Sequence, residues 1–293
     1  MHVYELKSTS EDITPGSIYW RKLSLDGQVS GYLAAEPDAE GCIYDVVRKT
    51  ALRPTGKGSE TEESYCERIV HDIAEDPDRY FQRGMITRTA EEIRAYETDM
   101  VGVAAMITWA RKHNVWPRQV SSCTNWNRVC EYFETCANGR PIEEYTTVRE
   151  EMNKGRGLPV LSASARSTYA LCPQKYQYAY EQRRRVVSED APALYFGKHL
   201  HTIIQAYHNP KAGFGNDGLE RALCRVTKMQ PGHDRGHMKA LVLGYHVKYE
   251  NSGLTLVDVE REFTRPLQDP ETGRQSTSFC LGGFIDGIAE VKK

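Results

Sequence analysis

A chain of 293 residues is long enough to bury a full hydrophobic core, as one large domain or two small ones. Its 38 Lys and Arg residues nearly balance 40 Asp and Glu residues, so the formal net charge of −2 excludes a generally basic surface. A nucleic-acid-binding surface would have to be a local patch. The run Arg183-Arg184-Arg185 is the strongest candidate, although such a run is more often a solvated face.

The chain shows neither a membrane span nor a secretory signal. No stretch approaches the roughly 18 consecutive apolar residues that cross a bilayer. The first residues, from Met1 to Glu5, lack the basic segment followed by an apolar one that marks a signal peptide. We therefore expect a cytoplasmic protein with no membrane partner.

The first predicted element is a strand over residues 2–7, in which Glu5 and Lys7 alternate with Tyr4 and Leu6. A strand with this alternation places the Glu5 carboxylate and the Lys7 ammonium on one face. Metal-dependent phosphodiester cleavage needs such a face, with an acid that holds Mg²⁺ and a cation beside the attacking water. Glu-x-Lys alone is not specific, because most such triplets lie on solvated strand edges.

The remainder of residues 1–54 is typical of an α/β arrangement. A turn at Pro15-Gly16 leads into a helix that places Gln28 and Tyr32 near one side, and a strand follows over residues 43–47. The next segment is predicted to be helical, because Ser59-x-x-Glu62 and Thr89-x-x-Glu92 are both capping-box patterns. Beyond the second box, apolar residues recur at helical spacing over some twenty residues and are interpreted as core packing.

Residues 138–160 are polar and contain several Gly and Pro residues, which predicts a connector. The aromatic segment that follows is predicted to be a single helix. The elements expected after the connector are helices over 161–180, 194–207 and 239–249, and strands over 254–263 and 279–291, the last broken at Gly282-Gly283.

Two motifs near the end of the chain make the Glu5-x-Lys7 pattern of the first strand informative. They are Gly197-x-x-x-His201 on a predicted helix and Gly283-Phe284-Ile285-Asp286 at the head of a predicted strand. Together with Glu5-Leu6-Lys7 and Gln28-x-x-x-Tyr32, they resemble the PD-(D/E)XK nuclease superfamily, specifically the exonuclease domains of RecB and AddB. The resemblance implies an α/β fold with a restriction-endonuclease-like core, in which helices flank a small central mixed sheet.

The resemblance also implies a role for each motif residue. The metal ligands would be His201, Asp286, Glu5 and the backbone carbonyl of Leu6. Lys7 would polarise the water or stabilise the pentavalent phosphorus, and Gln28 and Tyr32 would hold DNA near the cleavage point. Each residue alone has an ordinary explanation as a core histidine, a turn aspartate or a helix-surface side chain.

The motifs stand in an order that differs from that of the family. The family runs His, Asp, Glu-x-Lys and Gln-x-x-x-Tyr, whereas this chain begins with the last two. Joining Lys293 to Met1 would restore the order and leave eleven residues between Asp286 and Glu5, which fits a β-hairpin. We therefore predict a circularly permuted domain. A sequence stitched from two partial genes, or a circular contig opened within the gene, would give the same order.

This hypothesis defines the expected domain organisation. Residues 1–137 would be the C-terminal half of a nuclease domain together with a cysteine segment. Residues 138–160 would connect the former termini, and residues 161–293 would be the N-terminal half of the same domain. Overall we expect one structural domain.

Eight cysteines in a chain without a secretory signal indicate reduced thiols or metal ligands rather than disulfides. Cys123, Cys130 and Cys136 form a Cys-x6-Cys-x5-Cys segment, and Cys172 follows the connector. In AddB-type and CRISPR-associated adaptation nucleases, similar cysteines hold a [4Fe–4S] cluster. Four thiolates suit iron–sulfur or zinc, and the resemblance favours iron. The alternative is that they are buried small hydrophobes. The remaining cysteines are expected to be structural: Cys42, Cys66, Cys224 and Cys280.

The resemblance predicts an Mg²⁺- or Mn²⁺-dependent deoxyribonuclease. We expect an exonuclease that acts on single-stranded DNA ends in phage or bacterial recombination and repair, where a helicase or recombinase partner would fit. A non-catalytic DNA-binding module that retains the fold and the cluster as a scaffold is the alternative.

Overall fold

The computed structural model describes residues 1–56, 60–125, 128–149, 157–187, 192–213, 215 and 217–292. The chain divides into two compact units, and both halves expected from the sequence contribute to each. The first unit contains residues 1–88, 190–261 and 284–293, and the second contains residues 89–189 and 262–283. Strands β9 and β10 pass from one unit into the other.

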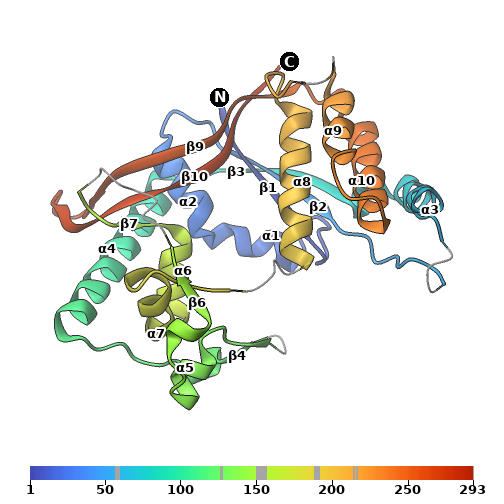
Figure 1. Ribbon diagram of the computed structural model, residues 1–293. Coiled ribbons are helices and arrows are strands. Elements are labelled where there is room, and N and C mark those ends of the chain that lie inside the picture. Colours follow the sequence, from blue (N-terminus) through green and yellow to red (C-terminus); the bar gives the residue numbers. More distant parts are fainter. Residues whose placement is uncertain are drawn as a thin grey trace. The chain divides into compact units, whose positions relative to one another are not determined.

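The first unit is a sheet with helices (Figure 1). Its strands are β1 (His2–Thr9), β2 (Cys42–Arg48), β3 (Phe81–Ile86) and parts of β9 (Leu254–Gln268) and β10 (Gln275–Val291). Its helices are α1 (Ile18–Arg21), η1 (Lys22–Leu25), α2 (Gly27–Ala35), α3 (Glu62–Glu75), η2 (Pro77–Arg79), α8 (Pro192–His208), α9 (Gly218–Val226) and α10 (His233–Tyr249).

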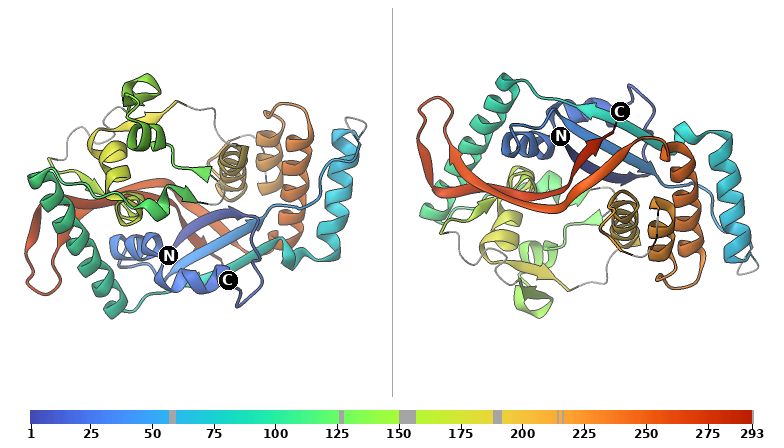
Figure 2. Two further views of the ribbon diagram at one scale, coloured as in Figure 1. Left: turned by 90° about the horizontal axis from the view of Figure 1, so that it is seen from below. Right: turned by 90° about the horizontal axis from the view of Figure 1, so that it is seen from above.

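The strands of the first unit form a mixed sheet in the order β3-β2-β1-β10, with β9 pairing with β10. β1 runs parallel to β2, whereas the β2–β3 and β1–β10 pairs are antiparallel. In the last pair His2 lies opposite Ala289 and Tyr4 opposite Gly287. The first and last strands of the chain are therefore neighbours, as both views in Figure 2 show.

Alternation along β1 separates the core from the polar face of the sheet. Tyr4 and Leu6 are buried in a cluster with residues of α3, α8, α9 and α10. The packing is close, since a Cβ at Gly244 on α10 would lie 2.6 Å from Ile73 of α3. Lys7 contacts Gln28 of α2 instead. The sheet thus directs its apolar side chains to one helical layer and its charged pair to α2.

The second unit contains the long helix α4 (Ala90–His113) and a set of short elements. Thr89 and Glu92 form the predicted capping box at the start of α4. The short elements are η3 (Val120–Ser122), β4 (Thr124–Asn125), β5 (Arg128–Val129), α5 (Phe133–Asn138), η4 (Ile142–Glu144), β6 (Thr146–Val148), β7 (Val160–Leu161), α6 (Ala163–Leu171), α7 (Pro173–Tyr176), η5 (Gln177–Glu181) and β8 (Arg184–Val186). Among the described residues, no helix is both long and apolar enough to cross a bilayer.

Helix α3 begins later than predicted. Ser59 lies outside the described residues, and the N-cap is Thr61, whose side chain accepts a hydrogen bond from the Ser64 amide. Glu62 does not close a capping box, because its carboxylate accepts from the Gly232 amide and pairs with Arg235 at the start of α10. Tertiary contacts have replaced the local capping pattern.

The predicted aromatic helix is interrupted at Cys172, which is extended between α6 and α7. Pro173 follows it, and a proline disfavours the helical conformation of the residue before it. The segment then continues through α7 into the π-helical turn η5. A single helix over residues 161–180 was therefore the wrong prediction.

The two closing strands are longer than predicted. β9 extends to Gln268, and β10 runs without a break through Gly282-Gly283. A Cβ at Gly282 would lie 2.8 Å from the Phe263 carbonyl oxygen, so glycine here permits close strand approach and does not end the strand.

The predicted connector also contains regular structure. Within its described part, β6 pairs with β8, and β7 pairs in parallel with β10 through Val160 and Cys280. The basic run is also partly engaged, since Arg184 donates to Glu143 at 2.6 Å. These pairings join segments far apart in the sequence, which local composition could not reveal.

Candidate active site

Glu5 and Lys7 lie on β1, in the middle of the first unit's sheet. The Glu5 side chain is fully buried and forms an ion pair with Lys7. Burial raises the pKa of the Glu5 carboxyl to about 8, and the nearby Asp286 carboxylate adds to this effect while Lys7 opposes it. Apart from the Lys7 ammonium, no described residue donates a hydrogen bond to the Glu5 carboxylate. The site therefore contains a buried carboxylate that is paired with the Lys7 ammonium.

Asp286 lies on β10, next to β1. Backbone pairing of the two strands ends at Tyr4. Two residues further along β1, the Leu6 amide donates a hydrogen bond to Asp286 Oδ2 at 3.0 Å. Burial opposes ionisation of Asp286, but the hydrogen bond and charge of His201 lower its pKa below the ordinary value. Asp286 thus sits inside a strand, not at its head or in a turn, and is held as a carboxylate.

His201 approaches the sheet from α8. Its Nε2 lies 3.0 Å from Asp286 Oδ2, and its Nδ1 lies 3.6 Å from Glu260 Oε1 on β9. Ligand atoms of His201, Glu260 and Asp286 all lie within 4.8 Å of one another. These three side chains could hold a metal ion from three different elements, beside the buried carboxylate of Glu5.

Glu260 was not predicted from the sequence. It stands among alternating acids, Asp258, Glu260 and Glu262, on the strand before Asp286, and nothing in that pattern distinguishes one acid from the others. Its backbone, however, has φ of 50°, which is unusual for a residue other than glycine and costs of the order of 1 kcal/mol. Strain of this kind concentrates at functional sites.

Gln28 and Tyr32 lie one turn apart on α2, where the sequence predicts a substrate-contacting face. Gln28 Oε1 accepts from Lys7 Nζ at 3.1 Å, and Gln28 Nε2 donates to the Tyr32 hydroxyl. Tyr32 is only 4 % exposed, and burial raises the pKa of its hydroxyl. Gln28 therefore holds the Lys7 ammonium in place, and Tyr32 in turn holds Gln28. A contact of Gln28 or Tyr32 with DNA stays a prediction.

The four predicted cluster cysteines lie in the second unit, and their segments converge. The β4–β5 hairpin brings Cys123 and Cys130 together, with the Cys130 amide donating to the Cys123 carbonyl at 2.7 Å. Ser122 donates to the Leu171 carbonyl at 2.8 Å, which places the residues before Cys123 and Cys172 in contact.

The third member of the segment, Cys136, also belongs to this neighbourhood. Burial raises the pKa of its thiol, and Cys130 and Cys172 lie close enough to raise it further. The four cysteines are partly exposed and form no disulfide. Of the other four, Cys42, Cys66 and Cys280 are buried and Cys224 is partly exposed.

Comparison with known proteins supplies one match. Residues 160–293 match the family model of the PD-(D/E)XK nuclease superfamily. This segment includes His201, Glu260 and Asp286 but not Glu5, Lys7 or α2, and covers somewhat less than half of the chain. No curated protein and no solved structure matches the chain.

The match and the structure together confirm the predicted fold class, an α/β fold with a central mixed sheet flanked by helices. Members of this superfamily are generally nucleases that use Mg²⁺ or Mn²⁺. The RecB or AddB type and the circular permutation stay predictions.

Proposed function

We propose that this protein is an Mg²⁺- or Mn²⁺-dependent DNA nuclease whose active site combines Glu5, Lys7, His201 and Asp286. The observation that carries the proposal is their convergence: residues from the first and last strands and from α8 lie around one buried carboxylate. A purely structural explanation is unfavourable, because burying Glu5 and Asp286 together costs free energy.

The donor set fits a hard divalent cation. Carboxylate oxygens and one imidazole suit Mg²⁺ or Mn²⁺, and among the described residues only the Lys7 ammonium donates to the buried Glu5 carboxylate. Glu5, Asp286 and His201 would hold the ion, with Glu260 or the Leu6 carbonyl as a further ligand. When bound, such an ion polarises a phosphoryl oxygen and lowers the pKa of a bound water.

The remaining groups act through position and charge. Lys7, held by Gln28 and Tyr32, would donate a hydrogen bond to the attacking water or to a phosphoryl oxygen as negative charge develops. The Leu6 amide and His201 fix the orientation of the Asp286 carboxylate. The site is thus preorganised by groups from β1, α2 and α8.

The converging cysteines support a [4Fe–4S] cluster in the second unit, bound by Cys123, Cys130, Cys136 and Cys172. Their segments meet through the β4–β5 hairpin and the Ser122 contact, and a structural zinc would use the same thiolates. Such a cluster would cross-link the segments before and after the predicted connector. It would take no part in phosphodiester cleavage.

The antiparallel β1–β10 pair also supports the proposed circular permutation. In the unpermuted order these strands would form a hairpin that carries Asp286 and then Glu5. We further propose that the enzyme is an exonuclease acting on single-stranded DNA ends in the cytoplasm of bacteria or phage-infected cells. Recombination or repair, with a helicase or recombinase partner, is the setting that this activity would serve.

The test is degradation of end-labelled single-stranded DNA in Mg²⁺. Asp286→Ala and Lys7→Ala should each reduce cleavage by at least about a hundredfold, because each removes a charge that the transition state needs. Both variants should keep the wild-type circular dichroism spectrum. Gln28→Ala should cost about tenfold, since it only positions Lys7.

Circular single-stranded DNA serves as the control for end dependence and should resist cleavage. Wild-type cleavage by the Asp286→Ala protein would refute the assigned site. Metal-independent DNA binding without any cleavage by the wild type would favour the non-catalytic scaffold.

A further inference from the structure

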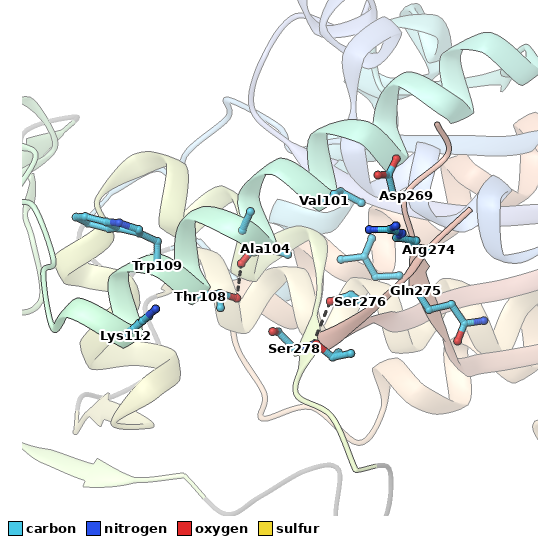
Figure 3. A pocket seen from close by; sticks show the side chains of 13 residues that line it. Val101, Ala104, Thr108, Trp109, Lys112, Asp269, Arg274, Gln275, Ser276 and Ser278 are labelled. Carbon is cyan, nitrogen blue, oxygen red and sulfur yellow. Dashed lines mark hydrogen bonds between the residues drawn. The ribbon is translucent and has the colours of Figure 1, made fainter. Parts of the chain in front are cut away.

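The second unit carries a groove of about 490 Å³ between α4 and the adjoining ends of β9 and β10 (Figure 3). On the helix, lining residues recur from Val101 to Lys112 at spacings of three and four, so they follow one side of α4. The opposite wall consists of Leu267 near the end of β9, Asp269 just after it, and residues 274–278 at the start of β10. No residue of the proposed active site lines this groove.

The groove combines an apolar floor with cations at its two ends. Ala104 and Leu267 contribute to the floor, while Arg274 and Lys112 lie toward opposite ends. Neither cation forms an ion pair among the described residues, and both are exposed. Asp269 is the acid in the lining. Its carboxylate accepts from the Thr272 hydroxyl and the Glu271 amide in the turn, and these bonds, with a smaller contribution from the nearby Arg274 charge, lower its pKa.

Trp109 supplies an aromatic surface beside Lys112. The indole is 54 % exposed although it is among the largest apolar side chains of the unit. It stacks on His113 of the same helix, with ring centroids 4.6 Å apart and an interplanar angle of 28°. An exposed indole next to an exposed ammonium is the pairing with which proteins stack a base and hold its phosphate.

The polar lining offers a hydrogen-bond donor as well. The Ser276 oxygen accepts from the backbone amides of Ser278 and Phe279, each at 3.2 Å. Those bonds do not use the hydroxyl proton, which can donate to a phosphate or base acceptor.

We propose that this groove binds a single strand of nucleic acid, with a base on Trp109 and phosphates at Lys112 and Arg274. The stretch of α4 from Val101 to Lys112 is about 16 Å long at 1.5 Å per residue, and stacked nucleotides advance about 3.4 Å each. The groove can therefore follow about four or five nucleotides. The proposal that the groove binds a nucleic-acid strand depends on the proposed nuclease function in one respect only, namely that the strand is DNA.

The test measures binding apart from cleavage. A fluorescein-labelled dT12 strand is titrated by anisotropy with Lys7→Ala protein in Mg²⁺, so that the strand stays intact. Adding Trp109→Ala should weaken binding about tenfold, and Trp109→Phe should restore it to within about threefold. Lys112→Ala should also weaken binding and reduce the salt slope by about 0.7.

Arg94→Ala is the matched control, because Arg94 is an exposed cation of the same helix outside the groove. Equal losses for Lys112→Ala and Arg94→Ala, unchanged affinity for Trp109→Ala, or undetectable dT12 binding would each overturn the groove assignment. So would a change in self-association with Trp109→Ala, which would assign the groove to a second copy of the chain.

The two proposals fail separately. A wild-type protein that cleaves DNA, while binding is indifferent to Trp109→Ala, overturns the groove alone. A protein that binds dT12 through Trp109 but never cleaves DNA overturns the nuclease proposal and leaves the groove in place.

Discussion

Two carboxylates in one buried site repel each other, and the residues around Glu5 and Asp286 show how this protein contains that repulsion. Lys7 pairs with Glu5, and His201 pairs with Asp286. The compensation is incomplete, since burial and Asp286 still raise the pKa of Glu5 to about 8. A divalent cation would complete it by favouring the charged form of both acids.

A second buried carboxylate, that of Asp45, lies on the face of the sheet opposite to Glu5 and has a structural role. Asp45 Oδ2 accepts from Arg83 at 2.7 Å and from the hydroxyls of Tyr4 and Tyr245. Tyr245 in turn lies 2.7 Å from His208 Nε2, near the end of the helix that carries His201. The network links the sheet to α8 and so helps to fix the position of the proposed metal ligand.

His208 should make stability depend on pH. Burial, with help from the Arg83 charge, lowers its pKa to about 4, whereas an unfolded histidine titrates near 6.5. Between these values the unfolded chain binds a proton that the folded chain does not, so stability falls as pH falls. We expect His208→Gln to lose this dependence, on the order of 3 kcal/mol between pH 7 and pH 4.

The measurement is urea unfolding of wild type and variant across that pH range, compared as a difference so that other titrating groups cancel. His71→Gln is the control, because the His71 side chain is 78 % exposed. Parallel stability curves for wild type and His208→Gln would contradict the prediction.

Sequence reasoning worked where the chemistry follows local periodicity. The alternation around Glu5 and Lys7 identified both their strand and their shared face, and the spacing of Gln28 and Tyr32 identified a helix side. It could not find Glu260, whose distinguishing feature is a backbone angle, nor the burial of Tyr32, which depends on packing against distant strands.

At the scale of elements, β9 and β10 contribute to both units through their exceptional length. The prediction placed a break at Gly282-Gly283, whereas β10 is continuous there because the missing side chain allows close approach to β9. Pro173 acted in the opposite sense and divided a predicted helix. Glycine and proline thus require tertiary context before they indicate a boundary.

The cysteine segment should stabilise the second unit without contributing to cleavage. Cys172→Ala would open one side of the proposed cluster, and we expect a cost on the order of 2 kcal/mol, since the chain already joins these segments covalently. Nuclease activity should persist. Anaerobically purified wild-type protein should be brown with about four irons per chain, as measured by iron analysis and absorbance.

Cys224→Ala is the control for this experiment, because Cys224 belongs to the first unit and should leave iron content unchanged. Colourless protein with stoichiometric zinc would replace the iron cluster by a structural zinc site. Thiols free of any metal would remove the site.

At the scale of the whole molecule, the order of motifs predicted that the ends of the chain meet at one sheet. His2 lies opposite Ala289, so described residues near the two ends of the chain are neighbours in one sheet (Figure 1). Lys293 itself lies outside the described residues. The division into two units was not predictable, because it depends on tertiary pairing along β10, which pairs with β1 through residues 287–289 and with β7 through residues 280–281.

A rearranged chain tests the permutation. The chain would begin at residue 150, continue to Lys293, pass through a Gly/Ser linker of about four residues to Met1, and end at Arg149. Since β1 and β10 are already antiparallel neighbours, we expect the same circular dichroism spectrum and Mg²⁺-dependent cleavage within about tenfold of wild type. The same chain with Lys7→Ala controls for contaminating nuclease, and a folded but inactive rearranged chain would contradict the proposal.

The central claim is that residues from both ends of the chain hold one catalytic metal ion, and anomalous diffraction from Mn²⁺-soaked crystals tests it most directly. We predict a single strong peak in the first unit, within coordinating distance of Glu5, His201 and Asp286, that disappears in the Asp286→Ala protein. A fully soaked crystal with no peak there, or with Mn²⁺ bound only elsewhere, would contradict the account.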